Sequence, residues 1–402
     1  MRSVAYVVTS RSKGTGGHLH SLRDLTDALS GAVRGTIRCI GTAPPPALNG
    51  AVMPVSFAAY RPRHLVQLLV ELARDLRRQR VELVHAFDPL ALKLVLPVAD
   101  ALGLPTVFTM CGGPTPRRDM PNVRDVILFS RENLDGLSTH PAMRGARLRL
   151  VPNRVHAVPV DARLGSARGR ALRAHLGLAD DALVLLRINR MSTVYAPVME
   201  QTMALAAALR TRGVPMHAVL VGSPNDPALV DALRARTGPF THLVTAPEFT
   251  HRAAELTPSA DAVVGTGRGL MEAASAGRPL LTPIADRRFP AVLGPSNFDT
   301  LHDTNFSPRN RLGLSDDALL EAAVETLATA EGRARAGAFA REMFDTRFDV
   351  HAAVGPYLET YAQAPPRALL DLPSDLARLG IGVGWERVRV LLGALPKGGT
   401  AD

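Results

Sequence analysis

The stretch from Asp261 to Ile284 reads DAVVGTGRGLMEAASAGRPLLTPI and predicts a strand, a glycine turn, a short helix and a second strand. A turn of this kind presents backbone N–H groups and the positive end of a helix to a phosphate. Arg268 adds a guanidinium there, and Glu272 lies one helical turn further on, where a carboxylate can accept from ribose hydroxyls. The pattern favours a nucleoside-diphosphate site, and a purely structural strand–turn–helix is its alternative. The predicted contacts are Thr266, Gly267, Arg268, Gly269 and Glu272.

The composition predicts a two-domain protein without a membrane span. The chain has 402 residues, of which 46% are hydrophobic, enough for two cores. It contains no run of eighteen apolar residues, and its first residues, MRSVAYVVTS, lead into a strand instead of a signal peptide. Cys39 and Cys111 show neither a pairing framework nor a metal spacing, so we expect a reduced, cytoplasmic protein without a bound metal.

The positive charge of the chain is unevenly distributed. The net charge is +10; residues 1–165 hold 22 Lys and Arg against 12 Asp and Glu, and the remaining residues hold 25 of each. Aromatic residues are 4% and do not alternate with the arginines, so nucleic acid is not an expected partner. Residues 61–80 have the pattern of an amphipathic basic helix. Such a helix either packs on a sheet with a solvated face or makes a peripheral contact with an anionic membrane.

Strand-like and helical runs alternate through both halves of the chain. Val4–Thr9 and Leu83–Phe87, for example, are strand-like, and Pro89–Leu102 is helical. This alternation predicts an α/β fold with parallel sheets, helices on both faces and ligands at the carboxyl ends of the strands. We expect an N-terminal domain over 1–165 and a C-terminal domain over 166–360. A helical tail over 361–402 is expected to pack back on the N-terminal domain, and Ala162–Arg170 is expected to be a polar linker.

Short segments along residues 1–360 resemble, in the same order, the motifs of glycosyltransferases of the GT-B fold, in particular the retaining group called family 4. The resemblance implies two facing Rossmann-like domains, of which the N-terminal one binds the acceptor and the C-terminal one a nucleotide sugar. The segments that carry it are Gly16-Gly17, Leu83–Ala86, Leu128–Glu132, Val151–Val155, Arg187–Arg190, Val219–Ser223 and Gly267–Pro279.

The resemblance also implies an activity. The protein would move a sugar, as a hexosyltransferase does, from a nucleoside-diphosphate sugar to an acceptor, with retention of configuration and without a metal. A UDP-sugar is the favoured donor, and the acceptor would be a carbohydrate, a lipid-linked sugar or a natural product. We expect a role in polysaccharide or natural-product biosynthesis, in the cytoplasm or at the inner face of the membrane.

Three alternatives remain beside this interpretation. A nucleotide-sugar epimerase on the same fold would bind the donor without transferring the sugar. A non-catalytic nucleotide-sugar-binding protein would keep the fold alone. A dinucleotide-binding oxidoreductase ranks last, because Arg38–Gly41 offers no acidic residue where the second strand would present one to a ribose.

The sequence departs from the family pattern at four places. Val264 stands where the first of two glutamates is usual, and Arg154 stands where a glycine is usual. The diphosphate-binding lysine is expected near Tyr195, but no lysine occurs between Lys93 and Lys397. The histidine usual near position 111 is missing.

Arginines are therefore the expected cations of the site. Sugar transfer leaves negative charge on the departing diphosphate, and an arginine can bind two phosphate oxygens at once. We expect Arg190 and Arg268 to be catalytic and Arg187 to bind the donor, with a structural ion pair as its alternative. His85 is expected to be a core residue, and no role is assigned to the polar loop Thr304–Asn310. Further expected donor contacts are Gly17, Gly222, Glu248 and Phe249; expected acceptor-facing residues are Gly16, His18, His20 and Cys111.

Overall fold

The computed structural model describes residues 1–10, 16–41, 45, 47, 48, 51–54, 62–112, 120–158, 162–179 and 181–393. The chain divides into two compact units. Unit 1 comprises Met1–Pro152 and Ala353–Asp402, and unit 2 comprises Asn153–Ala352. These limits differ from the expected 1–165, 166–360 and 361–402, because the last segment of the chain belongs to the first unit.

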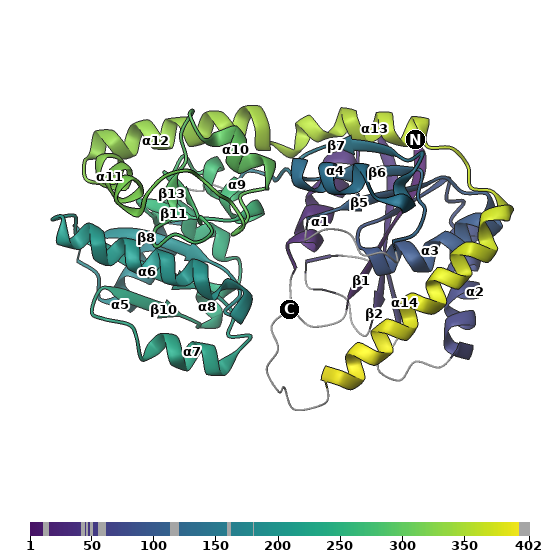
Figure 1. The fold of residues 1–402 in the computed structure, drawn as a ribbon, viewed down its shortest axis with the longest axis horizontal. Helices are drawn as coiled ribbons and strands as arrows, with labels where there is room; N and C mark the ends of the chain where they lie inside the picture. Colours follow the sequence, from purple (N-terminus) through teal and green to yellow (C-terminus); the bar gives the residue numbers. More distant parts are fainter. Residues whose placement is uncertain are drawn as a thin grey trace. The chain divides into compact units, whose positions relative to one another are not determined.

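Unit 1 is a doubly wound α/β structure. Its described strands form one parallel sheet in the order β3-β2-β1-β4-β5-β6-β7, so the strand order reverses between β1 and β4 (Figure 1). The strands are β1 (Arg2–Ser10), β2 (Val33–Gly41), β3 (Ala51–Pro54), β4 (Leu83–Ala86), β5 (Thr106–Met110), β6 (Asp125–Leu128) and β7 (Arg147–Leu150). The helices are α1 (Gly17–Leu29), α2 (Pro62–Arg78), α3 (Pro89–Leu102), α4 (Arg131–Ser138), α13 (Val354–Gln363) and α14 (Leu372–Gly393).

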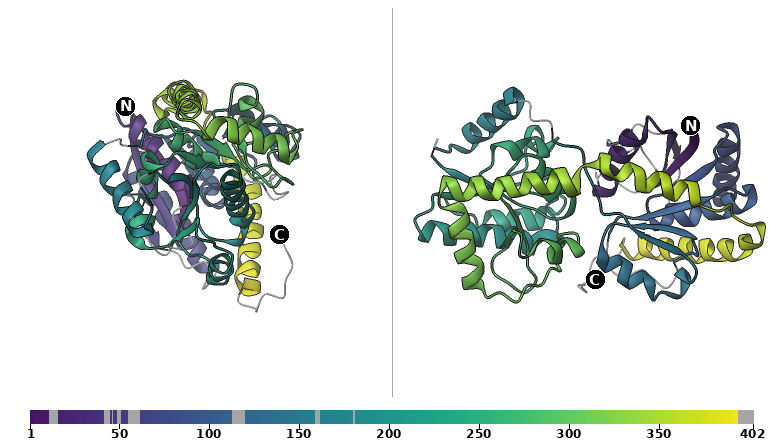
Figure 2. Two further views of the ribbon diagram at one scale, coloured as in Figure 1. Left: turned by 90° about the vertical axis from the view of Figure 1, so that its left-hand side faces the viewer. Right: turned by 90° about the horizontal axis from the view of Figure 1, so that it is seen from above.

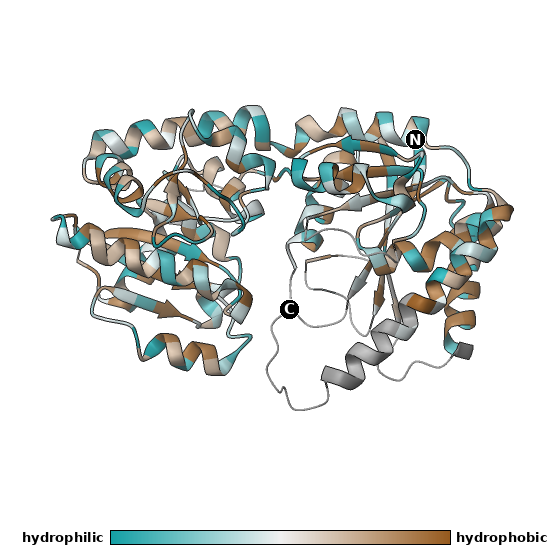
Figure 3. Ribbon diagram, viewed as in Figure 1, coloured by the Kyte–Doolittle hydropathy of each residue, from teal (hydrophilic) through white to brown (hydrophobic). Residues whose placement is uncertain are grey.

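Alternation along the strands supplies the two apolar faces of this sheet. Tyr6 and Val8 point to a core shared with α1 and α13, whereas Ala5 and Val7 point to a core shared with α2 and α3. A strand buried on both faces is a nearly continuous apolar run, which is why β1 could be recognised in the sequence. The central strands are accordingly coloured toward the hydrophobic end in Figure 3.

The C-terminal segment packs back on unit 1, as expected. Helix α14 lies on α3, and α13 contacts α1. The tail is helical, as expected, and α14 is one helix of 22 residues. A buried arginine, Arg367, anchors it: Nε donates to Asp100 of α3 at 2.6 Å, and Nη2 donates to Asp375 of α14.

This buried cluster predicts a pH-dependent stability of unit 1. Burial raises the pKa of Asp375 to about 6, although Arg367 beside it acts in the opposite direction and Asp100 adds to the rise. A carboxyl group with a raised folded pKa binds more protons when folded, so its contribution to stability falls as the pH rises from about 4 to about 6. Asparagine does not titrate, so the stability of D375N relative to the wild type should increase as the pH rises over this range. Thermal melts of both proteins between pH 4.5 and 7.5 measure this difference.

The exposed Asp231 provides the control for this experiment, since its side chain is 76% accessible. The variant D231N removes one carboxylate without touching the cluster. A wild type that gains stability over D375N with rising pH would contradict the raised pKa. Arg378 is a further charged group that faces Asp375, and Asp371 faces Asp100.

Unit 2 repeats the same topology. Its described strands are ordered β10-β9-β8-β11-β12-β13, all parallel except β13, and the order reverses between β8 and β11. The strands are β8 (Leu183–Ile188), β9 (Met216–Val221), β10 (Thr241–Val244), β11 (Ala262–Val264), β12 (Leu280–Thr282) and β13 (Ala291–Val292). The helices are α5 (Ala162–Leu176), α6 (Ala196–Thr211), α7 (Pro227–Arg234), α8 (Pro247–Thr250), α9 (Gly267–Ser275), α10 (Phe298–Asp303), α11 (Asp316–Leu327) and α12 (Ala330–Met343).

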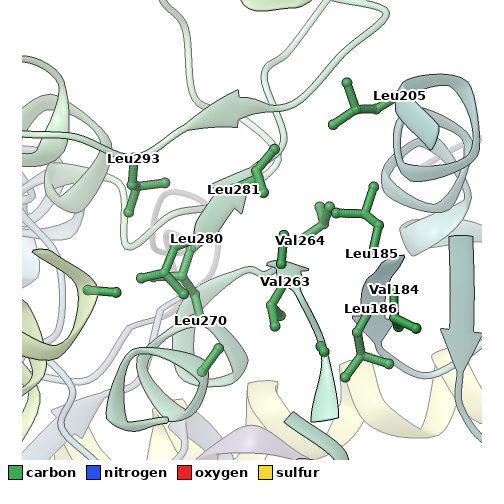
Figure 4. Packing of buried hydrophobic residues seen from close by; sticks show 14 of the residues in the cluster. Val184, Leu185, Leu186, Leu205, Val263, Val264, Leu270, Leu280, Leu281 and Leu293 are labelled. Atoms are coloured by element: carbon green, nitrogen blue, oxygen red, sulfur yellow. The ribbon is translucent and has the colours of Figure 1, made fainter. Parts of the chain in front are cut away.

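Helices cover both faces of the second sheet (Figures 1 and 2). In Figure 4, Leu185 and Val264 lie on the side of Leu205 from α6, and Val263 lies on the side of Leu270 from α9. The period of two along each strand separates these two sets. The buried strand β11 therefore packs between α6 and α9, and this packing holds the start of the turn that follows it.

The expected polar linker Ala162–Arg170 is wrong, because these residues open helix α5. The glycines of the segment lower its helix propensity and suggested a linker. Gly169 instead allows a close approach: a Cβ there would lie 2.3 Å from Cβ of Ser259, on the 3-10 helix Ala253–Ser259. The glycine thus serves helix packing within unit 2.

Candidate functional site

The candidate site lies where the strand order of unit 2 reverses, at the carboxyl ends of β8 and β11. Loops leave an open sheet in opposite directions at such a point, which is where α/β proteins bind ligands. The loop after β8 carries Arg190, and the turn after β11 carries Thr266 to Gly269. The sheet topology thus brings together two segments that lie about 75 residues apart in the sequence.

The glycines of this turn have separate structural reasons. A Cβ on Gly265 would lie 2.7 Å from Cα and Cβ of Leu270, so only glycine lets the strand turn directly into α9. Gly267 has φ +47°, a backbone conformation that favours glycine. Helix α9 begins at Gly267, and the Thr266 side chain makes no cap hydrogen bond to its N–H groups.

The backbone N–H of Gly267, one of the expected donor contacts, already has an acceptor within the protein. Its N–H donates to the backbone oxygen of Asn305 at 3.1 Å. Asn305 lies in the polar loop after α10 and has φ +55°, a conformation in which asparagine is enriched. The loop 304–310 therefore has a role that the sequence did not indicate: it braces the glycine turn.

Arg268 and Glu272 lie together on α9, as their spacing predicts. Nε of Arg268 donates to Oε1 of Glu272 at 2.7 Å, and the two side chains are 13% and 19% exposed. A phosphate bound by Arg268 would compete with Glu272 for the guanidinium, and a ribose would compete for the carboxylate. The pair thus presents one cation and one acceptor at the start of α9.

Arg187, at the end of β8, is fully buried, with 2% of the residue exposed. Its guanidinium donates to the Val264 oxygen at 3.0 Å and to Oγ1 of Thr266 at 3.2 Å. Nε donates to Oδ1 of Asn189 at 3.2 Å. Burial lowers the pKa of Arg187 to about 10, so it stays charged at neutral pH. The side chain ties the end of β8 to the turn after β11.

Arg190 has a different environment, because it is exposed. Its guanidinium carbon lies 5.9 Å from the ring centre of Tyr195, a cation–π distance. Tyr195 occupies the short 3-10 helix Thr193–Tyr195, at the position where a lysine was expected. An exposed cation on an ordered loop can reach a ligand that the buried Arg187 cannot.

Gly222, predicted to contact the donor, is explained by packing. A Cβ there would lie 1.7 Å from the backbone oxygen of Asn189. The loops after β8 and β9 are further joined where Met191 N–H donates to the Ser223 oxygen at 2.9 Å. Gly222 therefore lets the loop that carries Arg190 lie against β9. Asn189 was not among the predicted site residues, although it lies within the segment Arg187–Arg190 that carries the family resemblance.

Glu248 and Phe249 lie on α8. Phe249 is 6% exposed and belongs to the core of unit 2, and its ring centre lies 5.1 Å from that of His175. Core packing thus accounts for Phe249 in the structure. The Glu248 residue is exposed, and its backbone oxygen accepts from Arg168 at 3.0 Å.

In unit 1, the expected acceptor-facing residues lie at the corresponding edge of the sheet. Gly16 precedes α1 and Gly17 begins it, whereas the preceding Gly14 and Thr15 lie outside the described residues. His18 and His20 are half-buried in the first turn of α1. A Cβ on Gly16 would lie 2.7 Å from the His18 ring, so the histidine folds back over the glycine.

Cys111 follows β5 and is half-buried. Its sulfur lies 3.8 Å from the Phe87 oxygen. Burial, with a contribution from the negative charge of Asp88, raises the pKa of this thiol far above its usual range, so the thiol of Cys111 stays protonated at neutral pH. Asp88 itself accepts from the Thr9 N–H at 2.6 Å and joins the ends of β1 and β4.

His85 is a core residue, as predicted. Nδ1 lies 2.8 Å from the Tyr361 hydroxyl, and Nε2 lies 2.7 Å from the Thr109 hydroxyl. Burial lowers the pKa of His85 to about 3, so the imidazole is neutral.

Within the described ranges, no cluster of three or more His, Cys, Asp and Glu side chains could hold a metal ion. No helix in that part of the chain has both the length and the apolar character that a bilayer-spanning segment needs.

Comparison with known proteins defines the fold. No protein-family model and no curated protein matches the sequence. Among solved structures, Anabaena Alr3699/HepE in complex with UDP-glucose has a TM-score of 0.62 at 16% identity, over 89% of this chain and 99% of that chain. A glycosyltransferase from Rickettsia africae has a TM-score of 0.63 at 11% identity, over 90% and 98%. WaaG, a glycosyltransferase of lipopolysaccharide biosynthesis, has a TM-score of 0.54 at 15% identity, over 90% and 100%.

These likenesses cover nearly the whole length of each neighbour. The chain therefore has the two-unit α/β architecture of these proteins, the GT-B fold. The predicted fold class is confirmed.

Proposed function

We propose that the protein is a glycosyltransferase that moves a sugar from a nucleoside-diphosphate sugar to an acceptor. One observation carries the proposal: at the strand-order reversal of unit 2, the uncapped start of α9 meets the Arg268–Glu272 pair and the cationic Arg187 and Arg190. A diphosphate suits the arginines and the helix terminus, and a ribose suits the carboxylate. UDP-glucose bound to the similar HepE supports a UDP-sugar as the first donor to test.

In this proposal, the arginines act on the leaving group. When the bond between the sugar and the diphosphate breaks, negative charge accumulates on the β-phosphate oxygen. Arg190 and Arg268 stabilise that charge, and fixed positions of donor and acceptor lower the barrier further. We propose retention of configuration without a metal, as the family resemblance implies.

We assign the acceptor to unit 1. Gly16, His18 and His20 lie at the edge of the sheet where an α/β unit binds ligands, and the basic composition of residues 1–165 favours an anionic acceptor or an anionic membrane surface. A carbohydrate, a lipid-linked sugar or a natural product fits these requirements, in a cytoplasmic protein that contacts the membrane peripherally.

A ligand panel tests the donor assignment. We expect one nucleoside diphosphate among UDP, GDP, ADP and TDP, with UDP first, to raise the melting temperature by about 5 °C or more at 100 times its Kd. The physical reason is that a ligand bound only by the folded state stabilises it by about 2.7 kcal/mol at that concentration. The matched nucleosides are the controls, and no stabilisation by any diphosphate would contradict the proposal.

Val264 favours a second candidate, a protein on this fold that binds a nucleotide sugar without transferring it. The side chain is fully buried in the core of unit 2, so it offers no carboxylate to a donor sugar. Product analysis with labelled donor separates the candidates: transfer or hydrolysis supports the transferase, an isomerised sugar supports an epimerase, and an unchanged bound donor supports a binding protein.

A further inference from the structure

The surroundings of Arg187 are unusual for a buried charge. Its hydrogen-bond partners are a backbone oxygen, a hydroxyl and a carboxamide, all of them neutral, and they occupy three of its five N–H groups. Among the residues that the structure describes, no carboxylate lies within ion-pairing distance of this guanidinium. The expected alternative, a structural ion pair, is therefore not found within the described ranges.

Two other arginines are buried among the described residues, and both show the usual solution. Arg38 lies against the carboxylate of Asp75, and Arg367, whose side chain is 4% exposed, lies against those of Asp100 and Asp375. Burying a charge is costly unless an opposite charge lies beside it. Arg187 has no such carboxylate partner among the described residues. It lies instead at the point where the topology of unit 2 predicts a ligand.

The groups around Arg187 favour an anion at this point. Thr266, which accepts from its Nη2, is the residue before α9, so the positive end of that helix dipole lies beside the guanidinium. Arg268 follows two residues later on the same turn, and Arg190 follows on the loop after β8. Glu272 is the one carboxylate paired within this set, and its described partner is Arg268.

We propose that Arg187 is a buried cation whose counter-ion is the diphosphate of the donor. It acts as a positioning residue that does not touch the ligand: it holds Val264 and Thr266 in place and keeps a fixed positive charge beneath the turn. This inference rests on the proposed function, because it takes the donor to be a nucleoside diphosphate.

The consequence is a selective effect on the charged part of the ligand. Replacing Arg187 with a neutral residue should weaken the binding of a nucleoside diphosphate and leave the binding of the nucleoside unchanged, since only the diphosphate interacts with the charge. Lysine at this position keeps the positive charge but lacks the planar guanidinium and its set of N–H donors.

The test compares the affinities of UDP and uridine by calorimetry in the wild type, R187M, R187Q and R187K. We expect the UDP-to-uridine affinity ratio to fall about 10-fold or more in R187M and R187Q, the scale of one short-range charge interaction inside a protein. In R187K the ratio should stay within about 3-fold of the wild type. If R187M does not fold, R187Q and R187K carry the comparison, and the uridine affinity reports an intact site.

Arg173 supplies the matched control. Arg173 lies on α5, near the start of β8, and its side chain is partly buried. It donates to the Ala179 and Ala182 oxygens, and its guanidinium lies 3.8 Å from the Asp261 carboxylate. R173M should lower stability and leave the ratio unchanged. Equal ratios in R187Q and the wild type, or an equal loss in R187K and R187Q, would overturn the role of the charge. A wild type that binds none of UDP, GDP, ADP and TDP would instead contradict the proposed function together with this inference.

Discussion

The variant R268A is expected to release nucleoside diphosphate from a sugar nucleotide at least about 100-fold more slowly than the wild type. In the proposed mechanism Arg268 is a cation that faces the charge developing on the leaving group, and the loss of such a cation costs about two to three orders of magnitude in other electrostatic sites. The change should lie in kcat more than in KM, because the charge is largest in the transition state. The measurement is steady-state release of diphosphate from the donor that the ligand panel identifies.

Two further variants make this result interpretable. R190A removes the exposed cation on the neighbouring loop and is expected to lower kcat to a similar extent. R341A removes a guanidinium that donates to the Ser275 oxygen, at the far end of the same helix, at 2.9 Å. It should lower stability with little change in kcat. Near-normal turnover in both R268A and R190A would remove these residues from the mechanism.

The variant G222A is expected to lose about 3 kcal/mol or more of stability in unit 2. The new Cβ would lie 1.7 Å from the Asn189 oxygen, a backbone atom that cannot move without displacing the loop after β8. A loss of this size corresponds to a fall in melting temperature of about 6 °C or more. Calorimetric melts measure it, and donor turnover should fall too because Arg190 lies on the displaced loop.

Gly294 provides the control for this substitution. A Cβ at Gly294 meets no heavy atom within 4 Å, so G294A should melt close to the wild type. A G222A protein as stable as G294A would show that the loop can move away at little cost. That result would contradict the close approach of the two loops.

The glycine turn illustrates how far sequence reasoning reaches. Strand, turn and helix from Asp261 to Pro283 form as the pattern predicts, since the period of two and the glycines are local properties. The hydrogen-bond partner of the Gly267 N–H could not be predicted from the sequence, because its acceptor, Asn305, lies 38 residues further along the chain. Positive φ at Asn305 becomes visible only once the loop is folded against the turn.

The arginines of the site also show what sequence spacing predicts and what it leaves open. Sequence spacing placed Arg268 and Glu272 together, because residues four apart share one face of a helix. It ranked Arg190 ahead of Arg187, three residues earlier at the strand end, but it could not show which of the two is buried. Burial decides between them: Arg187 is enclosed by β8, β11 and Thr266, and Arg190 faces solvent beside Tyr195.

By itself, the sequence determined the α/β class, the repeated strand and helix pattern, and the turn that ends β11, because these depend on apolar periodicity and glycine placement within short segments. Only the tertiary structure decided that Phe249 belongs to the core and that Gly222 serves a close approach of two loops. Each of these depends on atoms far apart in the chain, and long-range packing leaves no periodic trace in a local stretch of sequence.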